Sequence, residues 1–329
     1  MKGNEIRLQI KRLNEDTVLL NKRSRLIHKF KASLFSVIKF IILLGISYII
    51  LGPIINIVAN SFYSPSDVYN PSVFLFPLNP TMDNYSLTYS RLEYWKTLGW
   101  SLLYVIALTA IQIIITSMAG YGFARFDFPF KKLLFACVII TIVLPTHTIM
   151  LPLYQHFRNW DIFGIFSASL GHKVNLLSSE APMFLMTLLG SGLRSGLFIY
   201  IFRQFFRGLP KEIEEAAFID GAGMAYTYLR IMMPNAIPSI VTVTVFSVVW
   251  QYNDMFYVNL FSMPSSKHIT FRLSTVRSTI EFVDLVKDPM ISQLNVYAGV
   301  ILVVLPILII YLFLQKYFIE GVERSGIVG

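Results

Sequence analysis

The sequence has few charged residues and almost no cysteine. Of its 329 residues, only 14% are Asp, Glu, Lys or Arg, whereas a typical soluble domain has about a quarter. Hydrophobic residues make up 55% of the chain, and the mean hydropathy is +0.60. This composition excludes a disordered protein and argues against an ordinary soluble enzyme. The single cysteine, Cys137, excludes an intramolecular disulfide and a multi-cysteine metal site.

The common signatures of nucleotide and metal chemistry are also missing. The sequence contains no G-x-x-x-x-G-K-[ST] phosphate loop, no H-E-x-x-H and no G-x-S-x-G. Its five histidines show no spacing suited to metal ligands. We therefore predict that the chain is not an enzyme and has no metal or cofactor of its own, so that any ATP and magnesium are bound by partner subunits.

Long uncharged runs dominate what the sequence does contain. A membrane-spanning helix needs about 20 mostly apolar residues. Runs of that size cover residues 40–59, 97–124, 133–157, 231–253 and 289–315. Residues 181–202, apolar except for Arg194, are a sixth predicted span. Residues 162–171 are too short to cross the membrane and are expected to form a surface or re-entrant helix. The predicted fold class is an all-α integral membrane protein with six transmembrane helices.

The distribution of basic residues predicts the orientation. The net charge is +9, and the first 33 residues hold nine Lys or Arg against three acids. Because cytoplasmic segments of membrane proteins are rich in Lys and Arg, both termini are predicted to be cytoplasmic. We predict a basic segment, residues 1–33, that contacts anionic membrane lipid and no nucleic acid. It is followed by a six-span domain over residues 34–329.

The cytoplasmic stretch 207–234 has the pattern of a docking element. Pro210 suits the first turn of a helix, and the acids that follow it lie near the positive end of the helix dipole. Gly221 and Gly223 permit a left-handed turn. A second short helix is predicted over residues 224–233. Small residues would let another protein approach the first helix closely.

The spacing of this stretch resembles the EAA loop of permease subunits of binding-protein-dependent ABC importers. The matching positions are Glu215, Ala216, Ala217, Gly221, Ile231 and Pro234, with Met233 where the family has Leu. Four further segments are similar to the carbohydrate-uptake branch, close to the maltose-type smaller permease: residues 80–85, 152–158, 201–210 and 315–321. The resemblance covers most of residues 34–329 and is weakest around residues 160–195.

This resemblance implies the type I ABC importer permease fold in a bacterial cell membrane. It implies that residues 207–234 form a coupling loop seated on a cytoplasmic ATPase. The coupling residues would be Glu215, Ala216, Ala217, Asp220, Gly221, Ile231 and Pro234. The implied partners are a second homologous permease, two ATPase subunits and an extracellular solute-binding protein that delivers a sugar or oligosaccharide.

Polar residues inside or beside the spans predict a substrate path, because such residues are costly in a membrane and often functional. Arg194, expected near the middle of the fourth span, either contacts substrate or serves as a structural ion pair or a snorkelling residue. Trp250, Tyr252, Asn253 and Asp254 lie at the end of the fifth span. Their aromatic faces and polar groups suit a carbohydrate, and the alternative is an aromatic belt at the membrane interface.

Three other functions remain open from the sequence. The EAA pattern does not set the solute, so a permease for a peptide or phosphonate is the first alternative. An ion-coupled secondary carrier would need no ATPase. An intramembrane enzyme would need a catalytic dyad, and none is evident in the sequence.

Overall fold

The computed structural model describes residues 33–326, and apart from one isolated bridge between Trp160 and Val174 these residues form no strand. The chain divides into two compact units, Met1–Asn60 and Ser61–Gly329. The described residues of the first unit form most of the apolar helix Ser33–Ser61. The predicted basic segment 1–33 lies almost wholly outside the described residues. The all-α fold class is confirmed for the part that is described.

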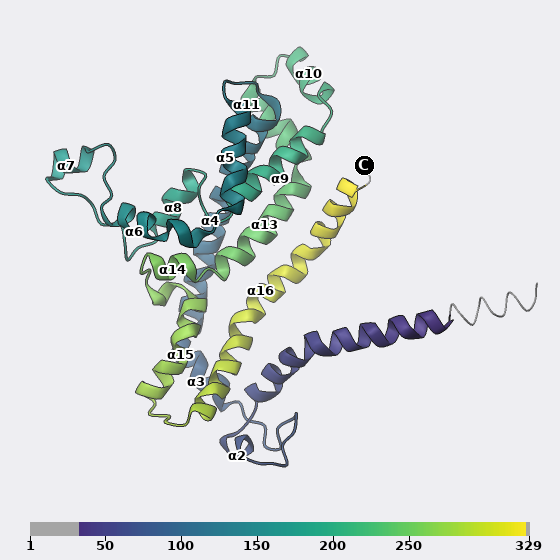
Figure 1. Ribbon diagram of the computed structural model, residues 1–329, viewed down its shortest axis with the longest axis vertical. Helices are drawn as coiled ribbons and strands as arrows, with labels where there is room; N and C mark the ends of the chain where they lie inside the picture. The colour runs from purple at the N-terminus through teal and green to yellow at the C-terminus, as the bar shows by residue number, and fades with distance from the viewer. Residues whose placement is uncertain (1–32, 327–329) are drawn as a thin grey trace, which may run out of the picture. The chain divides into compact units, whose positions relative to one another are not determined.

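The second unit is a succession of helices of very different length. In chain order they are α2 (Pro65–Val68), α3 (Asp83–Leu92), α4 (Tyr94–Arg125), α5 (Lys131–Val143), η1 (Thr146–Ile149), α6 (Met150–Arg158), α7 (Ile165–Leu170), α8 (Ala181–Leu188), α9 (Ser195–Gly208), α10 (Glu212–Ile219), α11 (Met224–Thr227), the π-helix η2 (Tyr228–Met232), α12 (Met233–Asn235), α13 (Ile237–Tyr252), α14 (Phe256–Leu260), η3 (Ser265–Lys267), α15 (Ile269–Val283) and α16 (Pro289–Gly326). Within this unit, α10 and α11 lie at one end and α3 and α15 at the other (Figure 1). We call these the α10 end and the α3 end.

Three of the six predicted spans are single helices of sufficient length and apolarity. They are Ser33–Ser61, Tyr94–Arg125 and Pro289–Phe313. Two more are pairs of helices joined at a sharp bend, which gives up to five spans among the described residues if each pair crosses once. The chain is therefore a multi-pass membrane protein, and the predicted number of six is not reproduced by continuous helices.

Proline accounts for one of the bends. Lys131–Val143 and Thr146–Arg158 meet at 102°, so the predicted span 133–157 is not one continuous helix. Pro145 lies at the break, where it lacks an N–H to continue the helix and holds Leu144 in extended backbone. The second pair, Met224–Asn235 and Ile237–Tyr252, is bent by 75° within the predicted span 231–253.

The prediction of a single helix over residues 181–202 is wrong. α8 ends at Leu188 and α9 begins at Ser195. Between them Gly190 has a φ of +74° and Arg194 a φ of +59°, which is left-handed backbone that stops a right-handed helix. Arg194 therefore lies in a break before α9, and not in the middle of a helix.

The long helix α4 is the element on which the second unit is packed, because it contacts both α9 and α13. On α9, the side chains of Phe198, Phe202 and Phe206 recur every fourth residue and are fully buried, as expected of one helix face. Facing them, Gly120 leaves room for this contact: a Cβ there would lie 2.6 Å from the Cβ of Phe202. Gly120 thus permits the close approach of α4 and α9.

Candidate coupling segment and transport path

The 207–234 stretch forms two short helical pieces joined by a left-handed turn. α10 carries three acids in its first turn, where the helix dipole favours them. After it, Gly221 has a φ of +82°, as predicted, and glycine adopts that conformation without steric cost. Gly223 differs from the prediction, because its φ of −76° is ordinary extended backbone at the start of α11. The residues from Met224 to Asn235 then continue as one helical segment.

Most of the coupling residues expected from the resemblance face away from the protein. Glu215, Ala216, Asp220 and Gly221 are exposed along α10 and its turn, whereas Ala217 is buried. Ile231 is half-buried in the π-helix, and Pro234 is exposed on α12. The exposed face also carries an apolar residue, Ile219, with 86% of its side chain accessible. α10 therefore exposes the carboxylates of Glu212 and Glu215 and the apolar side chains of Phe218 and Ile219, with the small Ala216 among them.

A buried ion pair that the sequence analysis missed holds α10 in place. Glu214 and Arg125, the last residue of α4, have side chains only 9% and 7% exposed, and Oε2 lies 2.7 Å from Nε. Tyr121 of α4 donates its hydroxyl hydrogen to Glu214 Oε1 at 2.5 Å. Arg125 also donates from Nη2 to the carbonyl oxygen of Leu209 at 2.8 Å. α10 is thus fixed to the end of the central helix.

Aromatic contacts fix the second helical piece to the same point. The ring of Tyr121 lies 5.2 Å from that of Tyr228 in the π-helix and 5.4 Å from that of Phe206 on α9. The hydroxyls of Tyr228 and Ser117 are 2.8 Å apart. Tyr121 therefore touches α9, α10 and the π-helix, which makes the end of α4 the common support of the segment.

Arg194 and Trp250 are far apart in the sequence, and both are predicted to line the substrate path. In the structure their side chains are in contact. The guanidinium carbon of Arg194 is 5.6 Å from the centre of the Trp250 ring, within the range of a cation–π contact. The ring of Trp250 also stacks with those of Phe198 at 5.7 Å and Phe246 at 5.1 Å. The Arg194 side chain is exposed, so this pair offers a cation and an aromatic surface at the break between α8 and α9.

The other predicted path residues have different surroundings. Tyr252 is buried and donates to the carbonyl oxygen of Val303 at 2.7 Å, which ties α13 to α16. Asn253 is exposed and bonds back to Val249. Asp254 accepts two backbone N–H groups at Oδ1, while its buried Oδ2 has no hydrogen-bond partner among the described residues. Asp254 is thus the predicted residue with an unused acceptor.

A buried amide in the middle of α4, which the sequence analysis did not select, joins the helices around this break. Gln112 is fully buried. Its Nε2 donates to the carbonyl oxygen of Leu193 at 2.5 Å and to Ser195 Oγ at 3.2 Å. Its Oε1 accepts from Ser247 Oγ at 2.8 Å and from Gln251 Nε2 at 3.1 Å. An amide side chain in a run whose other polar residues are mostly small hydroxyls was the available signal, because an amide needs several partners in a membrane.

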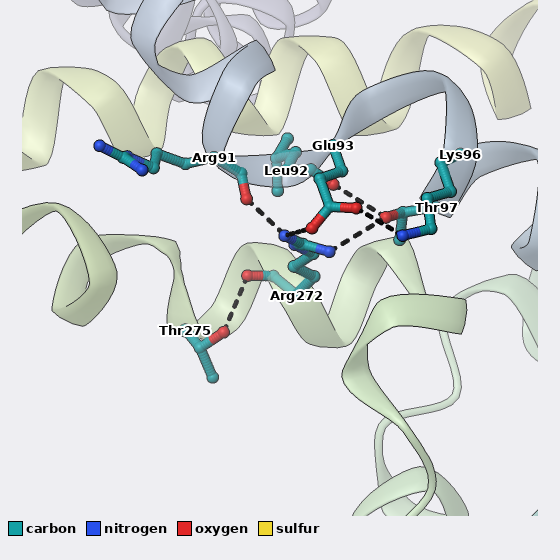
Figure 2. A network of polar contacts seen from close by, with 7 residues as sticks. All are labelled: Arg91, Leu92, Glu93, Lys96, Thr97, Arg272 and Thr275. Atoms are coloured by element: carbon teal, nitrogen blue, oxygen red, sulfur yellow. Dashed lines mark hydrogen bonds and ion pairs between the residues drawn. The ribbon is translucent and has the colours of Figure 1, made fainter. Parts of the chain in front are cut away.

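At the α3 end, a polar network joins the start of α4 to α15 (Figure 2). Arg272 donates from Nη2 to Glu93 Oε1 at 2.6 Å and from Nε to the carbonyl oxygen of Arg91 at 3.0 Å. Lys96 donates to the other oxygen of Glu93 at 2.8 Å. The hydrogen bonds from Lys96 and then Arg272 lower the pKa of Glu93 to about 2. Arg91 also pairs with Asp284, with 2.9 Å between Nε and Oδ2.

No cluster of three or more His, Cys, Asp or Glu side chains suited to a metal ion occurs within residues 33–326. The candidate coupling segment, residues 207–234, is largely exposed, and a buried ion pair between Glu214 and Arg125 holds it on α4. Of the predicted path residues, Arg194 lies in the helix break that Gln112 supports, and Trp250 contacts Arg194.

Comparison with known proteins identifies the kind of molecule to which this arrangement belongs. Residues 112–324 match the family described as "Binding-protein-dependent transport system inner membrane component". A probable ABC transporter permease of Pyrococcus horikoshii is 28% identical over 84% of this chain and 92% of its own length. The arabinooligosaccharides transport system permease AraQ of Halalkalibacterium halodurans is 25% identical over 86% of this chain and 93% of its own length.

A solved structure supports the fold. One chain of a bacterial ABC transporter involved in the import of the acidic polysaccharide alginate aligns with a TM-score of 0.69. The alignment covers 87% of this chain and 96% of that chain at 21% identity. At this identity the likeness establishes the shared helical fold.

Proposed function

Because the chain belongs to the family of binding-protein-dependent transport system inner membrane components, we propose that it is the permease subunit of an ATP-driven importer of a sugar or oligosaccharide. Its similarity to a permease named for arabinooligosaccharide transport supports the choice of solute. The structural observation that carries the proposal is the exposed α10–Gly221 element anchored to α4. ATP hydrolysis takes place on partner ATPase subunits, and this chain supplies the path.

We assign a different proposed partner to each end of the second unit. The α10 end faces the cytoplasm, as do both termini, and one of two ATPase subunits seats on Glu215, Ala216 and the turn at Gly221. A second, homologous permease completes the path across the membrane. The α3 end faces outward and receives the extracellular binding protein, where the network of Glu93 and Arg272 keeps α15 fixed to α4.

The contacts within the chain suggest how movement passes from the coupling segment to the path. A displacement of α10 acts on α4 through Glu214 and Arg125, because neither buried charge can be left without the other. α4 in turn holds the break before α9 through Gln112 and Leu193. Arg194 follows directly after Leu193, so the exposed cation beside Trp250 lies next to the part that would move.

Co-purification tests the coupling surface most simply. The tagged full chain should retain its ATPase subunits in mild detergent, and Glu215→Lys should weaken that retention because it reverses the charge of the exposed face. Glu212→Lys is the matched control, since Glu212 is an exposed acid on the same helix but outside the proposed contact set. A chain that transports the sugar without any associated ATPase would instead be an ion-coupled carrier.

Uptake measurements test the path. In the reconstituted complex, Arg194→Gln should reduce uptake of an acidic oligosaccharide more than uptake of a neutral one if the guanidinium contacts substrate. Equal effects on both would show that Arg194 is structural, through its contact with Trp250.

A further inference from the structure

A basic hollow beside the coupling segment has no role in the function proposed above. It measures about 660 Å³ and lies between the ends of α4, α5 and α9. This size falls in the range of small-ligand sites, roughly 300–1,000 Å³. Six basic side chains line it: Arg125, Lys131, Lys132, Arg203, Arg207 and Lys211. Asp127 is the one acid in the lining.

Two of the six positive charges are neutralised within the protein. Arg125 pairs with Glu214, and Lys131 pairs with Asp127 at 3.1 Å. The described side chains provide no ion pair for the remaining four, Lys132, Arg203, Arg207 and Lys211. An anion in the hollow would therefore meet an excess of positive charge.

The backbone of α5 adds to this positive field. α5 begins at Lys131, and its first turn contains no acid. The N-terminal end of a helix carries a partial positive charge that favours anions. Lys132, which has no ion pair among the described side chains, is therefore electrostatically unfavourable there unless an anion is nearby. On the facing helix, the Nε of Arg203 is buried without a hydrogen-bond partner among the described residues. Its guanidinium lies 3.8 Å over the ring of Phe135, which leaves it lining the hollow.

The location of the hollow favours a lipid over a free anion. The apolar helix α4 ends at Arg125 and the apolar α5 begins at Lys131, so the hollow lies where two membrane-embedded helices reach the surface. α5 buries none of its side chains, and Leu133, Leu134 and Val143 are exposed along it. Such a surface suits acyl chains, which a free phosphate does not have.

We propose that this basic hollow binds the phosphodiester headgroup of an anionic phospholipid, whose acyl chains lie along the exposed apolar surface of α5. Arg203, Arg207 and Lys132 contact the phosphate oxygens, because charge-assisted hydrogen bonds to phosphate are the strong ones. The site borders Lys211, directly before α10, so the bound lipid adjoins the coupling segment. The proposal is independent of the transported solute, and the proposed orientation adds only that the lipid is in the cytoplasmic leaflet.

Native mass spectrometry of the full chain in detergent tests this site. After delipidation, phosphatidylglycerol or phosphatidylcholine is added back and the retained lipid is counted. We expect preferential retention of phosphatidylglycerol, and a loss of about tenfold in its affinity for each guanidinium removed in Arg203→Gln and Arg207→Gln. Arg230→Gln is the matched control, because Arg230 is an exposed arginine of the same end outside the hollow.

Further arms separate the possible sources of the anion. Inorganic phosphate at the same concentration should not displace phosphatidylglycerol; displacement would show a site for free phosphate. Lys132→Gln, at an exposed position in the first turn of α5, gives a second test if the arginine variants fold poorly. Equal retention of the two lipids, unchanged retention in the pocket variants, or loss of the lipid when the ATPase subunits bind would overturn the proposal.

Discussion

Two neighbouring glutamates on α10 have opposite environments. Glu214 is buried against Arg125 and accepts a hydrogen bond from Tyr121, whereas Glu215 is exposed. Glu214 therefore anchors the helix, and Glu215 is available to a partner. At the residue scale, one position determines whether α10 is held on α4, and the next determines what can dock on it.

Glu214→Gln should destabilise the chain, because it leaves the Arg125 charge buried without its partner. Breaking a buried pair from one side costs about 3–5 kcal/mol, which should appear as a lower midpoint of thermal unfolding in detergent. Glu215→Gln is the matched control and should leave the midpoint unchanged. Removing both charges in Glu214→Gln/Arg125→Gln should recover part of the loss; an unaltered midpoint in Glu214→Gln would contradict the anchoring role.

The carboxylate of Glu93 should make the α3 end sensitive to acid. Its folded-state pKa is about 2, against an ordinary value of 4.5. A carboxyl with a lowered pKa stabilises the fold above its unfolded-state pKa, and that contribution is lost as the pH falls. Hydrogen exchange of α15 should therefore accelerate as the pH is lowered from 4.5 towards about 2, after correction for intrinsic exchange. Glu93→Gln should weaken this dependence. The remainder belongs to Glu281 on α15, because its hydrogen bond from Arg277 also lowers its pKa. An unchanged dependence in Glu93→Gln would contradict the contribution of Glu93.

At the scale of elements, a helix or turn could be predicted where residues close together in the sequence determine it. Long apolar runs predicted the helices containing residues 97–124 and 289–315, and the EAA spacing predicted the turn at Gly221. The helix break that contains Arg194 was missed because the length of an apolar run does not show whether the helix is continuous. Here the left-handed backbone at Gly190 and Arg194 interrupts the helix. The Glu214–Arg125 pair was missed because its partners lie 89 positions apart and no local pattern records which of three acids turns inward.

The close contact of α4 with α9 depends on one glycine. A Cβ at Gly120 would lie 2.6 Å from Phe202 Cβ and 2.9 Å from the backbone nitrogen of Arg203. Overpacking of this kind costs about 1–3 kcal/mol, so Gly120→Ala should lower the thermal stability of the purified chain. Gly122→Ala is the control, because its Cβ would meet only Phe126, at 4.0 Å. Equal stability of the two variants would show that α4 and α9 can move apart without loss.

At the scale of the whole second unit, α4 connects the two proposed sites. It ends in Arg125 beneath the coupling segment, carries Gln112 beside the helix break, and begins at the network of Glu93 and Arg272. We propose that force from an ATPase enters this helix through the α10–Gly221 element. This transfer of force requires the turn at Gly221 to keep its left-handed backbone.

Binding-protein-dependent uptake by the reconstituted complex tests this transfer of force. Gly221→Pro cannot keep a φ of +82°, because proline fixes φ near −65°. Gly171→Pro is the matched control, since Gly171 also has a positive φ and lies in an exposed loop away from the coupling segment. We predict that Gly221→Pro inserts into the membrane but does not transport, while Gly171→Pro transports as the parent does. Normal uptake by Gly221→Pro would show that coupling does not pass through this turn.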